Sequence, residues 1–321
     1  MRALVLQRLD GGDGLTIAEV PAPSGADDVI IEVHAAGIGF PDLLMTKGEY
    51  QFKPNPPFIP GVEAAGVVLS APASSGLRQG AHVIASTRLG AWAEVAAAHP
   101  LGTIPIPDGM SFEEATAMMN YQTAYFGFVW RGGMKSGETV LIHGAAGGTG
   151  TAAIQVARAL GGHVIAIAHG DEKLAIARDC GAHECIEAES DWLTEVRRIT
   201  DGRGVDIVYD PVGGDRFTDS VRSLAPLGRV LVIGFAGGAI PEVKVNRLLL
   251  RNTAVIGVAW GEYSRVDPSM PRTVSASLAT LYAAGHIRPP LGGMYPMERC
   301  AEALRDLGER RATGKLVLKV R

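Results

Sequence analysis

The sequence predicts an α/β protein in which a doubly wound parallel sheet is joined to an irregular β barrel. The middle of the chain alternates apolar strands with helix-length segments, a pattern typical of a parallel sheet. A glycine-rich turn separates the first of these strands from the helix that follows it. The first 120 residues instead contain short strands between Pro- and Gly-rich turns. Because 321 residues exceed a typical single domain of about 100–200 residues, two domains are expected.

The barrel is predicted from segments near both ends of the sequence. Short strands are expected at Ala3–Leu6, Val29–Ala36, Gly66–Leu69 and His82–Ala85. After Trp260 we expect helices at about Pro271–Ala284 and Met297–Arg311, then a last strand in "GKLVLKV". Because this end strand needs a partner, we expect it to return to the first domain. Residues 1–120 and 261–321 are therefore predicted to form one discontinuous domain, and residues 121–260 the other.

The parallel sheet is predicted from six apolar runs that begin at Thr139. The expected strands are Val140–Ile142, Val164–Ala168, Glu184–Glu187, Val205–Asp210, Arg229–Gly234 and Ala254–Val258. Helix-length segments between them begin near Asp171, Ser190 and Gly214, each with a cap residue or a turn before it.

The glycine-rich turn carries the strongest functional signal. Gly148-Thr149-Gly150-Thr151-Ala152-Ala153 matches G-x-G-x-x-A and follows Gly147, between a buried strand and an amphipathic helix. Glycines there permit a tight turn and let a pyrophosphate approach the backbone, while the helix N-terminus supplies N–H donors. In this context the pattern favours a dinucleotide site in a Rossmann fold over a purely structural turn.

Composition excludes several other classes of protein. The net charge of −4 provides no basic surface for nucleic acid or an anionic membrane. The N-terminus has too short an apolar run for a signal peptide, and three cysteines do not make a disulfide scaffold. We therefore expect a cytoplasmic protein with a small-molecule substrate and neither nucleic acid nor membrane as a partner.

The order of several motifs resembles the medium-chain dehydrogenase/reductase superfamily over essentially the full chain. They are "AAGIGFPDLLMTKGEYQFKPNPPFIPGVEAAGVV", "QTAY", "VLIHGAAGGTG", "VYDPVGG" and "TGKLVLKV". The chain is most similar to the zinc-independent, zeta-crystallin-like quinone oxidoreductases. The resemblance implies a GroES-like catalytic domain, a Rossmann domain, NADPH in the cleft between them and a homodimer. Beside the glycine turn, it implies cofactor contacts at Thr123, Gly234, Phe235, Ala236, Val258, Ala259, Trp260 and Lys315.

Residue types favour a protein that works without zinc. Zinc-bearing members of the superfamily have Cys in the segment that matches Gly37–Asp42 and His directly before Glu63, where this chain has Gly39 and Val62. The family's four-cysteine structural lobe is also missing. The pattern Cys180-x-x-His183-x-Cys185 offers three ligands in an unfavourable spacing. A helix that ends before Gly181, followed by a strand with small apolar thiols, is the favoured interpretation.

The absence of these zinc ligands limits the acceptors that such a site can reduce. A simple carbonyl needs its developing alkoxide stabilised, whereas a quinone or an enone spreads the incoming charge over its own π system. We therefore predict an NADPH-dependent reductase of a quinone or an activated C=C bond. An enoyl-thioester (acyl-CoA) reductase is the alternative enzyme, and a non-catalytic NADPH-binding sensor is the alternative of another class.

Few residues are candidates for assisting the reaction. Tyr50 lies on a stretch that borders the nicotinamide pocket in the family, and it is predicted to donate a proton or position the substrate. A loop tyrosine that covers the barrel is the alternative. Gly39, Phe40 and Trp260 are predicted to line the substrate pocket, with core packing the favoured role for Phe40. Relatives often have Asn at the position of Gly39, and some have Tyr at that of Leu44.

The choice of cofactor depends on the end of the second strand. An NAD-specific site places an acid there, but this chain has Ala168-His169-Gly170. Asp171 is predicted to cap the next helix, and His169 and Lys173 are predicted to meet the 2′-phosphate of NADPH. A carboxylate of Asp171 that faces the ribose remains the alternative.

Overall fold

The computed structural model describes residues 1–321, which divide into two compact units. The first unit contains Met1–Met119, Asp267–Ala279 and Pro289–Arg321; the second contains Asn120–Val266 and Thr280–Arg288. The predicted boundaries differ from this division mainly because they assign 261–266 and 280–288 to the first domain. Residue 288 is held in the second unit by Gln155, whose Oε1 accepts from Arg288 N–H (2.7 Å) and whose Nε2 donates to Arg288 O (2.9 Å).

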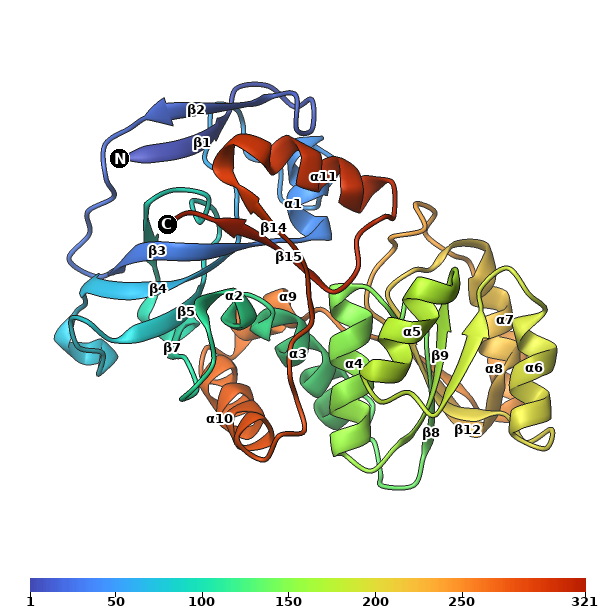
Figure 1. The fold of residues 1–321 in the computed structure, drawn as a ribbon. Helices are drawn as coiled ribbons and strands as arrows, with labels where there is room; N and C mark the ends of the chain where they lie inside the picture. Colours follow the sequence, from blue (N-terminus) through green and yellow to red (C-terminus); the bar gives the residue numbers. More distant parts are fainter. The chain divides into compact units, whose positions relative to one another are not determined.

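The first unit is mainly β structure. Its strands are β1 (Arg2–Leu6), β2 (Leu15–Glu19), β3 (Val29–Ile38), β4 (Glu63–Ser70), β5 (His82–Ser86), β6 (Val95–Ala98), β7 (Thr103–Pro105), β14 (Leu291–Pro296) and β15 (Lys315–Lys319). Its helices are α1 (Phe40–Thr46), α2 (Phe112–Ala115), most of α10 (Met270–Ala283) and α11 (Cys300–Gly308). Figure 1 shows these elements in blue, cyan and green as far as α2, and in orange and red from α10 to the C-terminus.

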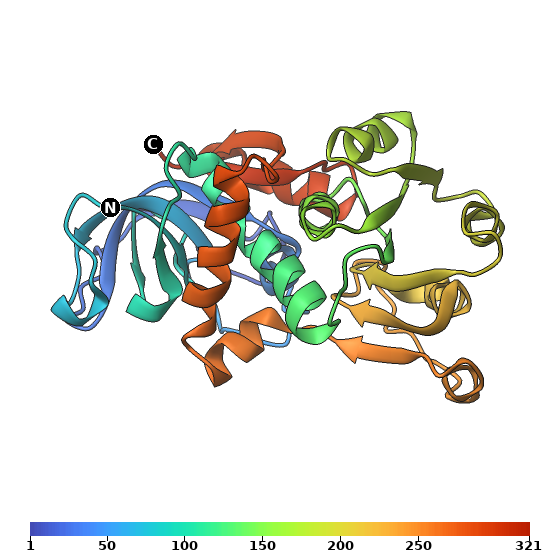
Figure 2. The same ribbon diagram turned by 90° about the horizontal axis from the view of Figure 1, so that it is seen from below.

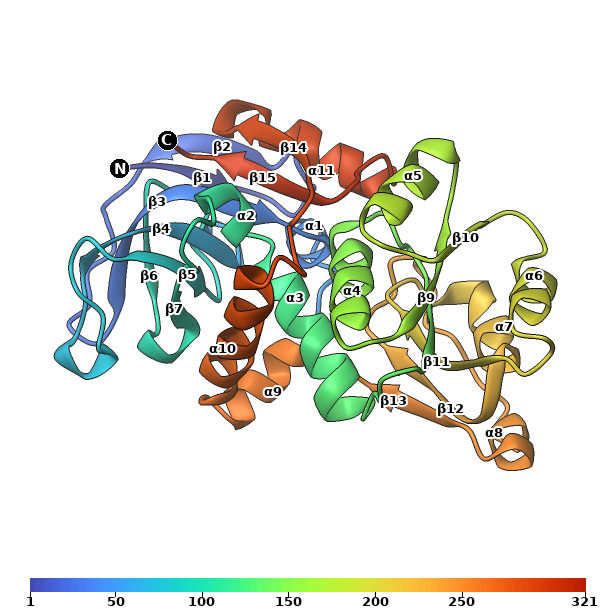
Figure 3. The same cartoon turned by 60° about the horizontal axis from the view of Figure 1, so that its bottom comes forward.

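The strands of the first unit pair across large sequence distances. The main sheet has the order β14-β15-β3-β4-β5-β7, with β6 also paired to β3, and β1 and β2 form a separate hairpin. Strand β15 runs antiparallel to β3, with Leu316 opposite Ile38, and parallel to β14 (Figure 3). The expectation that the last strand returns to the first domain is therefore confirmed. Trp92, which is fully buried, lies in the core beneath this sheet and donates its Nε1–H to Gly37 O (3.0 Å).

The second unit alternates strands and helices. Its strands are β8 (Thr139–Ile142), β9 (His163–Ala168), β10 (Glu184–Glu187), β11 (Val205–Asp210), β12 (Leu224–Val232) and β13 (Ala254–Gly257). Its helices are most of α3 (Met118–Tyr125, continued as a π-helical segment Phe126–Arg131), α4 (Gly148–Ala159), α5 (Asp171–Asp179), α6 (Trp192–Ile199), α7 (Phe217–Arg222), α8 (Asn246–Arg251) and α9 (Trp260–Val266).

All six strands of the second unit form one parallel sheet in the order β10-β9-β8-β11-β12-β13. Helices α4 and α5 cover one face and α6, α7 and α8 the other, as Figures 1 and 2 show. Apolar residues of α6 and α7, among them Trp192 and Phe217, pack on Leu141 and Val208 of the central strands. This doubly wound sheet confirms the predicted fold class, and its strand order is that of dinucleotide-binding Rossmann domains.

Some predicted elements differ at their ends. Strands β10 and β11 have the predicted bounds, but β12 begins at Leu224 instead of Arg229 and ends before Gly234. Its pairing with β11 shifts register between Val205 and Ile207, and Leu227 has a φ of 66°. The apolar run that predicts this strand begins only after the irregularity, so residues 224–228 were not predicted as part of β12. The predicted helix from Met297 starts as a 3₁₀ turn, and α11 ends at Gly308.

None of the helices in the structure combines the length and the apolar character that crossing a membrane requires.

Candidate active site

The glycine turn connects β8 to α4 in the second unit. After β8 the chain turns at Gly144, which has a φ of 59°, and Gly147 then caps α4 with extended backbone angles. A side chain is strained at a φ of this sign, so the turn requires glycine at position 144. The sequence motif places Gly148 in the turn, but in the structure Gly148 is the first residue of the helix. Gly144 was missed, although it lies in the same glycine-rich segment.

Gly150 packs the helix closely against the turn. A Cβ at this position would lie 2.7 Å from Cα of Ala145 and 2.8 Å from its carbonyl carbon, closer than real Cβ atoms come. The residues that follow Gly150 on α4 are buried through Ala157, so the helix has no room to move outward. Gly150 is therefore required by the close packing of the helix on the turn after β8.

The start of α4 fits a phosphate group. The first hydrogen bond into the helix runs from Thr151 N–H to Gly147 O (2.9 Å), so the N–H groups of Gly148, Thr149 and Gly150 precede the helical bonding pattern. Beside them, Asn120 Nδ2 donates to Thr149 Oγ1 (2.8 Å), while Asn120 Oδ1 is buried without a partner. Backbone N–H donors at a helix N-terminus, with its positive dipole end, bind phosphate oxygens well.

Several predicted cofactor residues meet at the edge where the parallel strands end. Gly234, Phe235 and Ala236 follow β12, and Ala236 N–H donates to Pro211 O (3.1 Å) after β11. Val258 and Ala259 follow β13, with Val258 N–H bonded to Val232 O (3.0 Å). Because carboxyl ends of parallel strands share one edge, these loops lie at the edge that carries the glycine turn. Thr123, also predicted to contact the cofactor, lies on α3.

Buried polar side chains fix this edge of the sheet. Asp210, the last residue of β11, accepts the N–H groups of Val212 and Gly213 through Oδ1 (2.9 Å each). His143, directly after β8, bonds through Nε2 to Ser220 Oγ (2.9 Å). Burial lowers the pKa of His143, which opposes a charge on the ring. With Ser220 fully buried, His143 is placed to hold the loops and not to meet a substrate.

Trp260 is anchored in an aromatic group of the second unit. Its Nε1–H donates to Gln122 Oε1 (3.2 Å), and its ring lies 5.4 Å from that of Phe126. Tyr263 stacks on the same phenylalanine at 5.0 Å. The Trp260 side chain is buried in this unit, so its orientation is fixed by packing and one hydrogen bond.

The end of β9 differs from the prediction at the cap of α5. The cap of α5 is Gly170, which has a φ of 84°, and Asp171 is the first residue of the helix, because the chain reverses sharply at the glycine. The side chain of His169, which is predicted to meet a 2′-phosphate, is exposed, and its Nδ1 lies 2.9 Å from Glu187 Oε1. Lys173 lies in the first turn of α5, as predicted.

The predicted pocket residues of the first unit surround the start of α1. Gly39 caps this helix and donates its N–H to Asp42 Oδ2 (2.9 Å). Phe40 packs against the barrel core, in agreement with its favoured interpretation. Tyr50 lies half-buried in the segment after α1.

A buried charged cluster lies next to these residues. Lys315 of β15 and Glu63 of β4 form an ion pair with side chains 4% and 8% exposed. Asp42 is also buried, and its Oδ1 has no hydrogen-bond partner. Burial, with the neighbouring Glu63 charge, raises the pKa of Asp42 to about 7. Lys315, predicted to contact the cofactor, has its amine paired with Glu63 inside the first unit.

Cys180 and His183 make structural contacts within the second unit. No group of three or more His, Cys, Asp or Glu side chains suited to a metal ion occurs in the structure. Cys180 ends α5, and Gly181, with a φ of 101°, reverses the chain as expected. His183 stacks on His163 at 4.1 Å and accepts the Val164 N–H. Burial raises the pKa of the Cys180 thiol to about 11, which opposes formation of a thiolate ligand.

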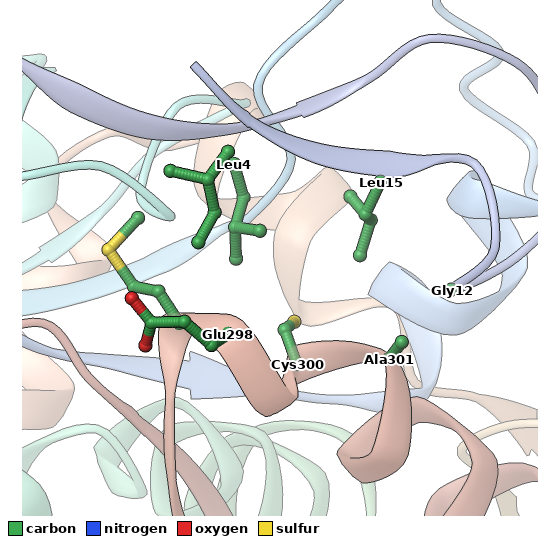
Figure 4. A pocket seen from close by; sticks show the side chains of 8 residues that line it. Leu4, Gly12, Leu15, Glu298, Cys300 and Ala301 are labelled. Atoms are coloured by element: carbon green, nitrogen blue, oxygen red, sulfur yellow. The ribbon is translucent and has the colours of Figure 1, made fainter. Parts of the chain in front are cut away.

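A separate hollow of about 280 Å³ lies in the first unit between the β1–β2 hairpin and α11. Figure 4 shows Leu4, Leu15 and Cys300 directed toward it, with Ala301 and Gly12 at one side. The lining is mainly apolar and contains none of the predicted site residues.

The chain is similar to known proteins over its full length. Residues 25–117 match the family described as alcohol dehydrogenase GroES-like domain, and residues 148–278 match the family described as zinc-binding dehydrogenase. The quinone oxidoreductase-like protein 2 of Rattus norvegicus is 39% identical over 96% of this chain and 89% of its own length.

Solved structures agree with these matches. A probable oxidoreductase from Mycobacterium abscessus is 44% identical with a TM-score of 0.91, covering 100% of this chain and 99% of that one. The quinone oxidoreductase of Thermus thermophilus, also solved in complex with NADPH, is 34% identical with a TM-score of 0.85 over 100% of both chains. The chain therefore belongs to the quinone oxidoreductase family of the medium-chain dehydrogenase/reductase superfamily.

Proposed function

We propose that the protein is a zinc-independent oxidoreductase that uses NADPH to reduce a quinone or an activated C=C bond. The observation that carries the proposal is the turn from Gly144 to Gly150, whose close backbone packing and first-turn N–H groups fit a pyrophosphate. Quinone oxidoreductases in the same family, among them that of Thermus thermophilus, have been solved with NADPH. These relatives support the choice of cofactor.

The second unit supplies the residues that would hold NADPH. The N–H groups of Gly148, Thr149 and Gly150 would donate to the pyrophosphate, and Asn120 Oδ1 beside them would accept from a hydroxyl of the nucleotide. The loops after β12 and β13 would border the nicotinamide, since both lie at the carboxyl edge of the sheet. Lys173 in the first turn of α5 would meet the 2′-phosphate.

The bound cofactor supplies hydride, and the chain's residues orient the acceptor. Gly39 and Val62 have no metal-binding group, so an acceptor that delocalises the incoming charge suits this site better than a simple carbonyl. The Tyr50 hydroxyl is the proposed donor of a proton or of a hydrogen bond to the reduced acceptor. Trp260, fixed by Gln122 and Phe126, would provide an apolar wall.

We also propose that the chain forms a homodimer through β13. This strand ends the parallel sheet, and two of its four residues are exposed. Nearby segments carry the exposed apolar side chains Ile240, Val245, Leu249 and Leu250, each at least 72% exposed. An open sheet edge with apolar neighbours is typical of a surface that a second chain covers. Sedimentation measurements on the purified protein test this proposal.

An assay panel tests the reaction. NADPH oxidation is followed by absorbance with a benzoquinone, an alkyl enone and crotonyl-CoA, each with wild type, Tyr50→Phe and Tyr295→Phe. We expect turnover of the quinone or the enone, lowered about tenfold or more in Tyr50→Phe by loss of the donor. Tyr295→Phe, which removes a hydroxyl bonded to Asp306 (2.7 Å) in the same unit, is the control. Turnover of crotonyl-CoA alone identifies an enoyl-thioester reductase, and NADPH binding without turnover identifies a sensor.

A further inference from the structure

The acid that β9 lacks is supplied by the neighbouring strand. Glu187 is the last residue of β10 and stands in register with Ala168, the last residue of β9. The two strands are parallel, so the Glu187 carboxylate reaches the sheet edge at which the first three strands end. In dinucleotide-binding sheets, an acid at the end of the second strand hydrogen-bonds the adenosine ribose.

Three donors hold this carboxylate in place. Oε2 accepts the Gly170 N–H at 2.7 Å, while Oε1 lies 2.9 Å from His169 Nδ1 and 3.3 Å from the Glu189 N–H. The Gly170 hydrogen bond lowers the pKa of Glu187, and the Glu189 N–H and His169 lower it further. The group is therefore ionised at neutral pH. It stays accessible, with Glu187 36% and His169 70% exposed in their side chains.

Other carboxylates lie near Glu187 and add to its negative charge. Asp171 and Glu172 lie with Lys173 in the first turn of α5, and Arg216 is paired with Glu189 at 2.9 Å. His169 is engaged by Glu187 itself. Lys173 is thus the cation of this α5 turn, and it lies among carboxylates.

We propose that Glu187 is a specificity-determining residue at the adenosine ribose, which accepts a hydrogen bond from the 2′-hydroxyl of NADH and disfavours the 2′-phosphate of NADPH. The proposal rests on the dinucleotide site proposed above. A 2′-phosphate carries between one and two negative charges, so a carboxylate at this position repels it whichever cations it meets. Glu187 therefore limits the preference for NADPH, and the wild-type chain binds both nucleotides.

The experiment compares Glu187→Gln with wild type and with Glu184→Gln. Glutamine keeps the shape and an oxygen for the Gly170 N–H but removes the charge. Glu184 begins the same strand at its opposite end, so Glu184→Gln removes an equal charge away from the ribose. Dissociation constants for NADPH and NADH are measured by quenching of tryptophan fluorescence at low, fixed ionic strength.

We expect Glu187→Gln to bind NADPH about three- to tenfold more tightly and NADH about two- to fivefold more weakly. The gain for NADPH should shrink as salt is added, because screening weakens the repulsion. Glu184→Gln should bind both nucleotides as wild type does. An unchanged ratio of the two constants in Glu187→Gln, or weaker NADPH binding, overturns the role of Glu187. Failure of wild type to bind either nucleotide overturns the proposed function instead.

Discussion

The amine of Lys315 and the carboxylate of Glu63 form an ion pair inside the first unit although 252 positions separate them. The pair joins β15 to β4 across β3, where Gly37 lies between them. A Cβ on Gly37 would approach the Lys315 amine to 2.8 Å, so only glycine leaves room for the pair. The ion pair therefore fixes the last strand and also determines a residue type on β3.

Replacing Lys315 with Met should destabilise the first unit strongly. The change leaves Glu63 and Asp42 buried without a cation, and breaking a buried pair costs about 3–5 kcal/mol. Urea unfolding measures the loss, with Lys319→Met on the exposed end of the same strand as the control. The double variant Lys315→Met/Glu63→Gln should recover part of the stability. A loss below about 1 kcal/mol in the single variant would show that the pair does little for stability.

Asp42→Asn should change how stability depends on pH. The pKa of Asp42 is raised to about 7 by burial and by the Glu63 charge, so the fold favours its protonated form. This contribution is complete below about pH 4 and is lost as pH rises toward 7. Asparagine stays neutral, so the variant should gain on wild type over that window by about 1.4 kcal/mol per pH unit at most. Unfolding curves from pH 4 to 8 measure the gain, with exposed Asp13→Asn as the control. Parallel stability profiles would contradict the prediction.

Gly150→Ala should abolish or greatly weaken NADPH binding. The new Cβ would meet the backbone of Ala145, which forces the turn and α4 apart. Fluorescence titration measures binding, and thermal unfolding reports the accompanying loss of stability. Gly261→Ala is the control, because a Cβ there meets nothing within 4 Å and the substitution leaves the turn intact. Normal NADPH affinity in Gly150→Ala would show that the cofactor does not bind at this turn.

Activity should not depend on zinc, because Gly39 and Val62 replace the expected ligands. Elemental analysis of the purified protein should find no stoichiometric zinc, and dialysis against a chelator should leave NADPH oxidation unchanged. Tightly bound zinc, with activity lost on its removal and restored on its return, would refute this prediction.

Lys173→Ala should weaken NADPH about ten- to a hundredfold and leave NADH nearly unaffected. A charged hydrogen bond contributes roughly 1.5–3 kcal/mol, and only NADPH carries the phosphate that would receive it. Both nucleotides are titrated at one ionic strength, since salt screens the contact. If NADPH and NADH binding were weakened equally, Lys173 would support the structure of α5 and would not contact the 2′-phosphate.

Local patterns were enough to predict most of the fold. The strands at Glu184–Glu187 and Val205–Asp210 have the bounds that their apolar runs indicate. Pairing of the last strand with the first domain also followed, because an isolated strand at the chain end has to find a partner. The start of β12 could not be predicted, because the register shift arises from its pairing with β11 and leaves no pattern in the sequence of β12 itself.

The site was less predictable because side chains meet across strands. The motif placed a glycine turn correctly but gave the wrong glycine, since only the folded backbone shows that Gly144 adopts a positive φ. The roles of Glu187 and Lys315 depend on partners from other strands. The sequence pattern for dinucleotide sites looks for an acid a fixed number of residues after the glycines, at the end of the second strand. An acid on the next strand, such as Glu187, is therefore missed.

Placing β15 beside β3 has a consequence for the order of events during synthesis. Strand β3 is complete when residue 38 has been made, and β6 pairs with its residues 29–32, yet residues 35–38 lack their partner on that edge until residues 315–319 leave the ribosome. All six strands of the parallel sheet, by contrast, are present once residue 257 has emerged. The nucleotide-binding sheet can thus form on a nascent chain whose first 119 residues still carry an open edge. During synthesis this unpaired part of β3 is therefore a site where another chain could pair and cause aggregation.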